Sequence, residues 1–161
     1  AATAFGKTVV SSAIIAQKKV NTLIILESSA LIEQWKDALE KFLNIDEELP
    51  SYKTKTGRVR KRKSLIGTLQ GVHDSMTGIV DIAMVGSLCK KGEFHNLLND
   101  YGLVLIDECH HAASDTISNV LKEVKAKYVY GVTATPKRGD GLEKINYMLI
   151  GPIRYLSLIH I

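Results

Sequence analysis

The sequence has few cysteines and no long apolar run, and each shortage excludes a class of protein. With only two cysteines among 161 residues, Cys89 and Cys109, a disulfide framework is excluded, and we expect both thiols to be reduced. No apolar run approaches the roughly 18 residues that a membrane-spanning helix needs, and the first residues do not follow the order of a signal peptide. We therefore expect a cytoplasmic chain without a membrane partner.

The charge is concentrated in one segment. The net charge is +4, yet Ser51–Lys63 carries seven lysines and arginines and no acid, while the rest of the chain carries 14 basic and 17 acidic residues. This pattern favours a local contact with a polyanion over a generally basic surface, and a solvated loop stays open as the alternative. The length and the 45% apolar content predict one domain.

Continuous apolar runs alternate with helical patterns along the chain. Parallel strands that are covered on both faces have such runs. The predicted strands are Thr22–Leu26, Ile79–Val85, Leu103–Ile106 and Tyr128–Val132, with a weaker one at Leu65–Leu69. The predicted helices cover residues 31–42 and 117–124, and Asp115 is the expected N-cap of the second of these. A last helix is predicted to start at Asp140 and to end near Ile150. The alternation predicts a three-layer α/β domain with a mainly parallel sheet and ligands at the carboxyl ends of its strands.

A Gly6-Lys7-Thr8 triplet follows a loop of small residues and opens a helical pattern. Backbone N–H groups of such a loop favour an anion, the lysine can reach phosphate oxygens, and the threonine hydroxyl can bind Mg²⁺. The triplet alone is a weak signal, because Ala1 stands where the general pattern has glycine. An ordinary helix start is the alternative.

Two carboxylates, Asp107 and Glu108, come directly after the Leu103–Ile106 run, about 100 residues later. A phosphate site needs both: Asp107 can hold Mg²⁺, and Glu108 can deprotonate the attacking water. The alternative is an acid pair that only caps the next helix.

The next residues, Cys109, His110 and His111, invite a metal interpretation. Three adjacent side chains point in different directions and cannot easily close a tetrahedral zinc site. We expect His110 to bridge Glu108 to a neighbouring strand, and Cys109 to pack as a small apolar residue.

Thr133 and Thr135 follow the Tyr128–Val132 run and are stopped by Pro136. They are expected on the same edge of the sheet as the carboxylates. Their hydroxyls could contact Asp107 or His110, and a simple exit from the strand would look much the same.

Taken in order, AATAFGKT, ILESSALIEQW, IAMVGSL, DECH and TATP resemble the motifs of the first RecA-like ATPase domain of superfamily 2 helicases and translocases. The subgroup resembled is the DEAD/DEAH-box family that includes type III restriction-enzyme res subunits and xeroderma pigmentosum group B type repair helicases. The resemblance covers residues 1–155, which we expect to form one RecA-like P-loop domain that lacks its first strand.

The resemblance implies an ATP-dependent helicase or translocase that uses ATP and Mg²⁺ and binds nucleic acid, DNA rather than RNA, together with a second RecA-like domain of the same protein. It implies nucleotide binding by Ala4, Phe5, Gly6, Lys7 and Thr8, Mg²⁺ binding by Thr8 and Asp107, catalysis by Glu108, Asp107 and Lys7, coupling through His110, Thr133 and Thr135, and nucleic-acid contacts at Ser28 and Ser87. Two departures are Ala4, where the family usually has glycine, and Glu27, where proline or histidine is common. A nucleic-acid-binding module with a degenerate ATP site and a P-loop switch or kinase of another class are the alternatives.

The segment Tyr52–Lys63 is predicted to form a loop or short hairpin around Thr56-Gly57. We expect Arg58, Arg60, Lys61 and Arg62 to contact nucleic-acid phosphates.

The last six residues, 156–161 (LSLIHI), do not continue the pattern of the fold. CTGTCTCTTATACACATC, an end used in transposase-made sequencing libraries, reads in frame as these residues, so we expect a non-native tail.

Overall fold

The computed structural model describes residues 3–54, 56–90, 92–109, 115–133 and 143–154. The main strands are β1 (Thr22–Leu26), β4 (Ile66–Gln70), β5 (His73–Asp74), β6 (Val80–Met84), β9 (Leu103–Asp107) and β10 (Tyr128–Val132). The helices are α1 (Thr3–Lys18), α2 (Ile32–Phe42), α3 (Val85–Leu88), α4 (Asp115–Glu123) and α5 (Glu143–Ile150), with 3-10 turns η1 (Ser29–Leu31) and η2 (Asn96–Asn99). Two small antiparallel pairs are β2 (Ser51–Lys53) with β3 (Val59–Lys61), and β7 (Cys89–Lys90) with β8 (Glu93–Phe94).

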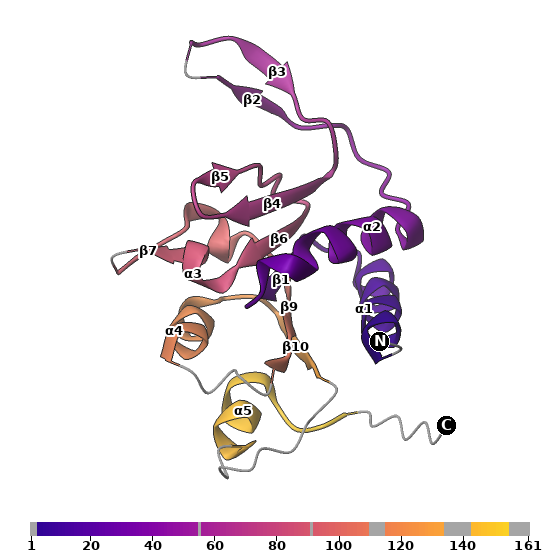
Figure 1. Ribbon diagram of the computed structural model, residues 1–161, viewed down its shortest axis with the longest axis vertical. Helices are drawn as coiled ribbons and strands as arrows, with labels where there is room; N and C mark the ends of the chain where they lie inside the picture. Colours follow the sequence, from indigo (N-terminus) through magenta and orange to yellow (C-terminus); the bar gives the residue numbers. More distant parts are fainter. Residues whose placement is uncertain (1–2, 55, 91, 110–114, 134–142, 155–161) are drawn as a thin grey trace.

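The six main strands form one sheet in the order β10-β9-β1-β6-β4-β5. All neighbours are parallel except β4 and β5, which form a hairpin. Helices α1 and α2 lie on one side of this sheet, and α3 and α4 lie on the other (Figure 1). The three-layer α/β architecture with a mainly parallel sheet is thus confirmed.

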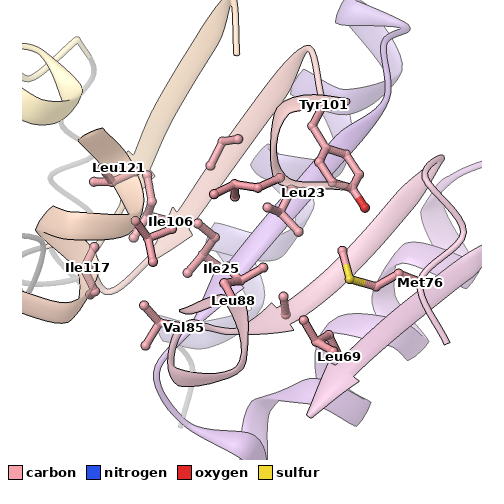
Figure 2. Packing of buried hydrophobic residues seen from close by; sticks show 14 residues of the cluster. Leu23, Ile25, Leu69, Met76, Val85, Leu88, Tyr101, Ile106, Ile117 and Leu121 are labelled. Carbon is pink, nitrogen blue, oxygen red and sulfur yellow. The ribbon is translucent and has the colours of Figure 1, made fainter. Parts of the chain in front are cut away.

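Successive side chains of each strand point to opposite faces of the sheet, so the core forms two layers. In β1, Ile24 and Leu26 belong to the cluster that packs against α1 and α2, including Trp35. Leu23 and Ile25 belong to the cluster that packs against α3 and α4, as Figure 2 shows. Because both faces of β1 are covered, all five of its residues are buried, as a continuous apolar run predicts.

The predicted elements are present with two differences. Strand β10 is only half-buried along its length, not buried as predicted, because it stands at the edge of the sheet and pairs only with β9. Helix α1 begins at Thr3 rather than after Gly6. Ala4 favours a helix and has less conformational freedom than the glycine expected there, so the first residues extend the helix in place of the predicted loop.

The basic segment forms a hairpin that projects from the sheet (Figure 1). Strands β2 and β3 are antiparallel, with Tyr52 opposite Arg60. The turn is closed by a bond from Gly57 N to Thr54 O, at 2.8 Å, and Gly57 has a φ of 78°, which glycine adopts without strain. The predicted hairpin is therefore confirmed.

None of the helices in the described ranges has the length and hydropathy of a membrane span.

A buried carboxylate, Asp81, joins the amino end of β6 to the elements around it. It is 0% exposed and accepts hydrogen bonds from Thr77 N at 2.8 Å, Gly78 N at 2.7 Å and the Tyr101 hydroxyl at 2.6 Å. Burial, together with the negative charge of Asp81, raises the pKa of Tyr101 far above its ordinary value, so the phenol stays a donor. Because both oxygens of the carboxylate accept hydrogen bonds, this buried acid is compatible with the core.

We expect Gly67→Ala to destabilise the fold by about 1–3 kcal/mol, the usual cost of overpacking a core. A methyl group at Gly67 would lie 2.6 Å from the Ser75 carbonyl oxygen and 2.8 Å from Met76 Cα, and it would also meet Asp81. The backbone atoms among these neighbours cannot turn aside. Urea unfolding measures the effect. Gly86→Ala is the control, because its methyl group would meet nothing within 4 Å; equal stability of the two variants would contradict this packing.

Candidate active site

Lys7, Asp107 and Glu108 meet at the carboxyl edge of the sheet. The Lys7 ammonium group donates a hydrogen bond to Glu108 Oε1, from 101 positions away in the sequence, and its Nζ lies 3.3 Å from Asp107 Oδ1. The three side chains are exposed by 16%, 6% and 32% for Lys7, Asp107 and Glu108. The structure thus brings together the two motifs that the sequence predicted for one phosphate site.

The electrostatic environment keeps Lys7 charged. Burial lowers its pKa, but the hydrogen bond to Glu108 and the charges of Asp107 and Glu108 outweigh burial, and the net pKa lies above the ordinary value of lysine. Lys7 therefore stays an ammonium group throughout the neutral pH range and compensates two carboxylates that lie side by side.

Glu108 has an unusual backbone conformation that directs its side chain. Its φ of 49° lies in the left-handed region, which residues other than glycine rarely adopt. Strand β9 ends at Asp107, and Glu108 N donates to Asp107 Oδ1 at 2.9 Å. The chain therefore turns sharply out of the strand, and both carboxylates lie next to Lys7. Such strain is maintained where the surrounding contacts fix it, and it is common at active sites.

Thr133 holds the second oxygen of Glu108. Its hydroxyl donates to Glu108 Oε2 at 3.0 Å, so Glu108 is bound by Lys7 at one oxygen and by Thr133 at the other. The sequence led us to consider Asp107 or His110 as partners of this hydroxyl. The described contact is with Glu108, because Val132 pairs with Asp107 across β10 and β9 and Thr133 follows one residue later. A contact with His110 stays a prediction, because His110 lies outside the described residues.

Asp107 is held by groups from three elements. One oxygen accepts from Glu108 N and lies near Lys7, as above, and the other, Oδ2, accepts a hydrogen bond from Trp35 Nε1 at 3.0 Å. Trp35 lies on α2 and is 2% exposed. Sequence reasoning did not assign Trp35 to the site, because a tryptophan in an amphipathic helix is usually a core residue.

Cys109 packs as a small apolar residue, as expected. Burial, followed by the charges of Glu108 and Asp107, raises the pKa of its thiol to about 11, so the thiolate is a negligible species at neutral pH. A methyl group at Gly131 would lie 2.6 Å from Cys109 Sγ. Glycine at this position therefore lets β10 approach the turn that carries Glu108.

The residues fit Mg²⁺ with a nucleotide phosphate by the chemistry of their donors. Mg²⁺ is commonly bound by one or two carboxylates together with phosphates and water, and Asp107 with the buried hydroxyl of Thr8, which is 3% exposed, are such donors. A phosphate can replace the carboxylates as the partner of Lys7, and a cation can replace Lys7 as the partner of Asp107. Each charge in the site then keeps an opposite charge.

The zinc interpretation of Cys109, His110 and His111 concerns residues that are only partly described. No three side chains of histidine, cysteine, aspartate or glutamate within the described ranges gather where they could hold a metal ion. His110 and His111 lie outside those ranges, as does Thr135, so their predicted roles stay predictions. Ala4 and Phe5 lie in the first turn of α1.

The two serines that are predicted to contact nucleic acid differ in their exposure to solvent. Ser28 is exposed after β1, and its side chain makes no capping hydrogen bond to η1. Ser87 is 8% exposed, and its hydroxyl accepts a hydrogen bond from Gly71 N at 2.8 Å. This geometry favours a structural role for Ser87, which holds the β4–β5 hairpin.

Of the four cations predicted to contact phosphates, Arg58, Arg60 and Lys61 are exposed on the basic hairpin. Arg62 is used differently: its guanidinium donates to Met76 O at 3.1 Å and lies over the Tyr52 ring at 4.5 Å. Arg62 therefore anchors the hairpin to the sheet, which the sequence pattern did not predict.

Comparison with known proteins places this geometry in a family. Residues 1–138 match the family described as type III restriction enzyme, res subunit. The chain is 33% identical over 153 residues to "DNA 3'-5' translocase XPB2" of Sulfurisphaera tokodaii, covering 95% of this chain and 30% of that protein. It is 32% identical over 155 residues to "DNA 3'-5' helicase XPB" of Kineococcus radiotolerans, covering 93% and 25%, and 28% identical over 155 residues to the protein of the same name from Mycobacterium tuberculosis, covering 93% and 25%.

The chain thus spans between a quarter and a third of the length of these relatives. The family match covers most of the chain, and the contact between Lys7 and Glu108 unites its two nucleotide motifs. The chain therefore belongs to the superfamily 2 helicase family of type III restriction enzyme res subunits, as a RecA-like domain similar to that of XPB proteins.

Proposed function

We propose that this chain is the ATP-binding and hydrolysing half of an ATP-dependent helicase or translocase that moves on nucleic acid, and on DNA in particular. The observation that carries the proposal is the direct contact of Lys7 with Asp107 and Glu108 at the carboxyl edge of a parallel sheet. DNA is favoured because the relatives named above are a DNA translocase and DNA helicases.

The roles of the side chains follow from their positions. ATP would supply the phosphoryl group that is transferred to water, and Mg²⁺ would neutralise part of its charge. Lys7 would bind phosphate, and Thr8 and Asp107 would hold the cation. Glu108 orients a water molecule and accepts its proton, and the Thr133 hydroxyl, 3.0 Å from Glu108 Oε2, keeps the carboxylate turned toward the site.

The rate of ATP hydrolysis by the intact protein, with and without single-stranded DNA or RNA, tests this proposal. We expect hydrolysis that rises when DNA is added. An intact protein that binds nucleic acid and does not hydrolyse ATP under either condition would be a binding module with a degenerate site, which would contradict the proposal. Stimulation by RNA alone would overturn the assignment to DNA.

The hairpin gives a separate prediction about nucleic-acid binding. If Arg58, Arg60 and Lys61 each contact a phosphate of single-stranded DNA, replacing all three with serine should flatten the log-log salt dependence of binding by about 2, since each contact contributes roughly 0.7. We expect weaker binding to every sequence and unchanged nucleotide affinity, because phosphate contacts carry no sequence information. Arg62 is retained in this variant, since it anchors the hairpin.

The matched control removes the same charge from another surface. Lys122, Lys125 and Lys127 are exposed near the amino end of β10, at the edge of the sheet opposite to the site. Their replacement with serine should leave the salt slope near that of the parent protein. Equal slopes in the parent and in the hairpin variant would make the hairpin a solvated element.

A further inference from the structure

The chain contains one tryptophan, and its polar atom is directed at the candidate cation site. Trp35 is 2% exposed, and its Nε1 donates a hydrogen bond to Asp107 Oδ2 at 3.0 Å. The Asp107 side chain, which is the acceptor, is 6% exposed, so little water can replace the indole if it is removed. A hydrogen bond to an ionised acceptor is stronger than one between neutral groups.

The hydrogen bond from Trp35 and the contacts of the other oxygen together orient the Asp107 side chain. The other oxygen, Oδ1, accepts from Glu108 N at 2.9 Å and lies 3.3 Å from Lys7 Nζ. If Lys7 turns to a phosphate, its contact with Asp107 is lost, and the hydrogen bonds from Glu108 N and Trp35 Nε1 still hold the carboxylate. The orientation of its oxygens then depends on the indole N–H.

Trp35 also joins Asp107 to the segment that carries Ser28. The chain passes from the exposed Ser28 through η1 directly into α2, and Trp35 lies in the first half of that helix. Resting on the proposed function of the site, we propose that Trp35 is a positioning residue, which orients Asp107 for Mg²⁺ and links it to the candidate nucleic-acid segment.

Removing the N–H while keeping an aromatic ring separates positioning from packing. In Trp35→Phe we expect the affinity for Mn²⁺, used with ADP as a probe for the Mg²⁺ site, to fall by about 10-fold to 100-fold, as is typical when a group that orients a metal ligand is lost. The electron paramagnetic resonance signal of free Mn²⁺ measures this affinity without turnover. The affinity for ADP in EDTA should change little.

Leu39→Ala is the matched control for packing. Leu39 is fully buried in α2 within the same core cluster, and it loses more volume than Trp35→Phe without removing a polar group. We expect the control to unfold at lower urea concentration and to keep its affinity for Mn²⁺. A Trp35→Phe protein that binds Mn²⁺ as tightly as the parent would overturn the inference, as would an equal loss in Leu39→Ala. A parent protein that binds no Mn²⁺ with ADP would instead overturn the proposed function.

The parent chain provides a second measurement that needs no folded variant. Trp35 is its single tryptophan, so the intrinsic fluorescence reports on one indole. We expect Mg²⁺ with ADP to shift or quench this emission, and ADP with EDTA to have a much smaller effect, because the cation acts on the carboxylate that accepts the indole hydrogen bond. Emission that does not respond to Mg²⁺ with ADP would also overturn the inference.

Discussion

Glu108→Gln is expected to slow ATP hydrolysis by the intact protein by about 10² to 10⁴, the usual contribution of a positioned general base. Glutamine has nearly the same shape, and its carbonyl oxygen can still accept the bond that Thr133 donates to Glu108. It cannot accept a proton from water at neutral pH. The affinity for ATP should therefore stay near that of the parent protein while turnover falls.

Steady-state hydrolysis and equilibrium ATP binding, measured on the same preparation, check this result. Glu123→Gln is a suitable control, because Glu123 is an exposed carboxylate at the end of α4. It should hydrolyse ATP at the parent rate. Unchanged turnover in Glu108→Gln would remove Glu108 from the mechanism, whatever its geometry.

The second large expected effect is on the rate of ATP hydrolysis, and it concerns the second RecA-like domain of the proposed helicase or translocase. The family resemblance implies a second RecA-like domain whose arginines stabilise the charge of the transition state, and such an arginine accelerates related phosphoryl transfers by about 10³ to 10⁵. We therefore expect the 161-residue chain alone to hydrolyse ATP more slowly than the intact protein by a factor in this range.

Single-turnover rates of the two proteins at saturating Mg²⁺ and ATP give this comparison. The hydrogen bonds of Glu108 and Asp107 lie within the described chain, so the isolated chain should retain the groups that we propose to bind metal and water. Hydrolysis by the isolated chain at nearly the rate of the intact protein would show that no group from outside it is needed.

The sheet could be predicted from the sequence because strands that are buried on both faces are continuously apolar. The runs that became β1 and β9 are continuous and apolar, and both strands are buried throughout. Strand β10 has a similar composition but lies at an edge. Composition records the apolar character of a strand and not the number of its neighbours, so its position in the sheet could not be predicted.

The candidate site was predicted where its chemistry depends on residue type. A lysine after glycine and two acids after a strand are informative by themselves, and the structure joins them. The partners that orient them were not predicted, because they depend on the positions of side chains from distant segments. Trp35 donates a hydrogen bond to Asp107 from 72 positions away in the sequence, and Arg62 donates one to the carbonyl group of Met76.

The first turn of α1 shows the limit of a motif. The Gly6-Lys7-Thr8 triplet predicted a loop before the helix, and the structure has a helix from Thr3. Local helix propensity at Ala4 favours this conformation. The motif predicted roles for Lys7 and Thr8 without determining the conformation of the backbone that precedes them.

We propose that Lys7, Thr8 and Asp107 bind a magnesium nucleotide. Isothermal titration of ADP with Mg²⁺ into the intact protein and into Lys7→Ala tests this claim without turnover. The loss of one charged hydrogen bond, about 1.5 to 3 kcal/mol, predicts that Lys7→Ala weakens binding by roughly 10-fold to 150-fold. Equal affinity of the two proteins, or no binding by the parent protein, would contradict the claim.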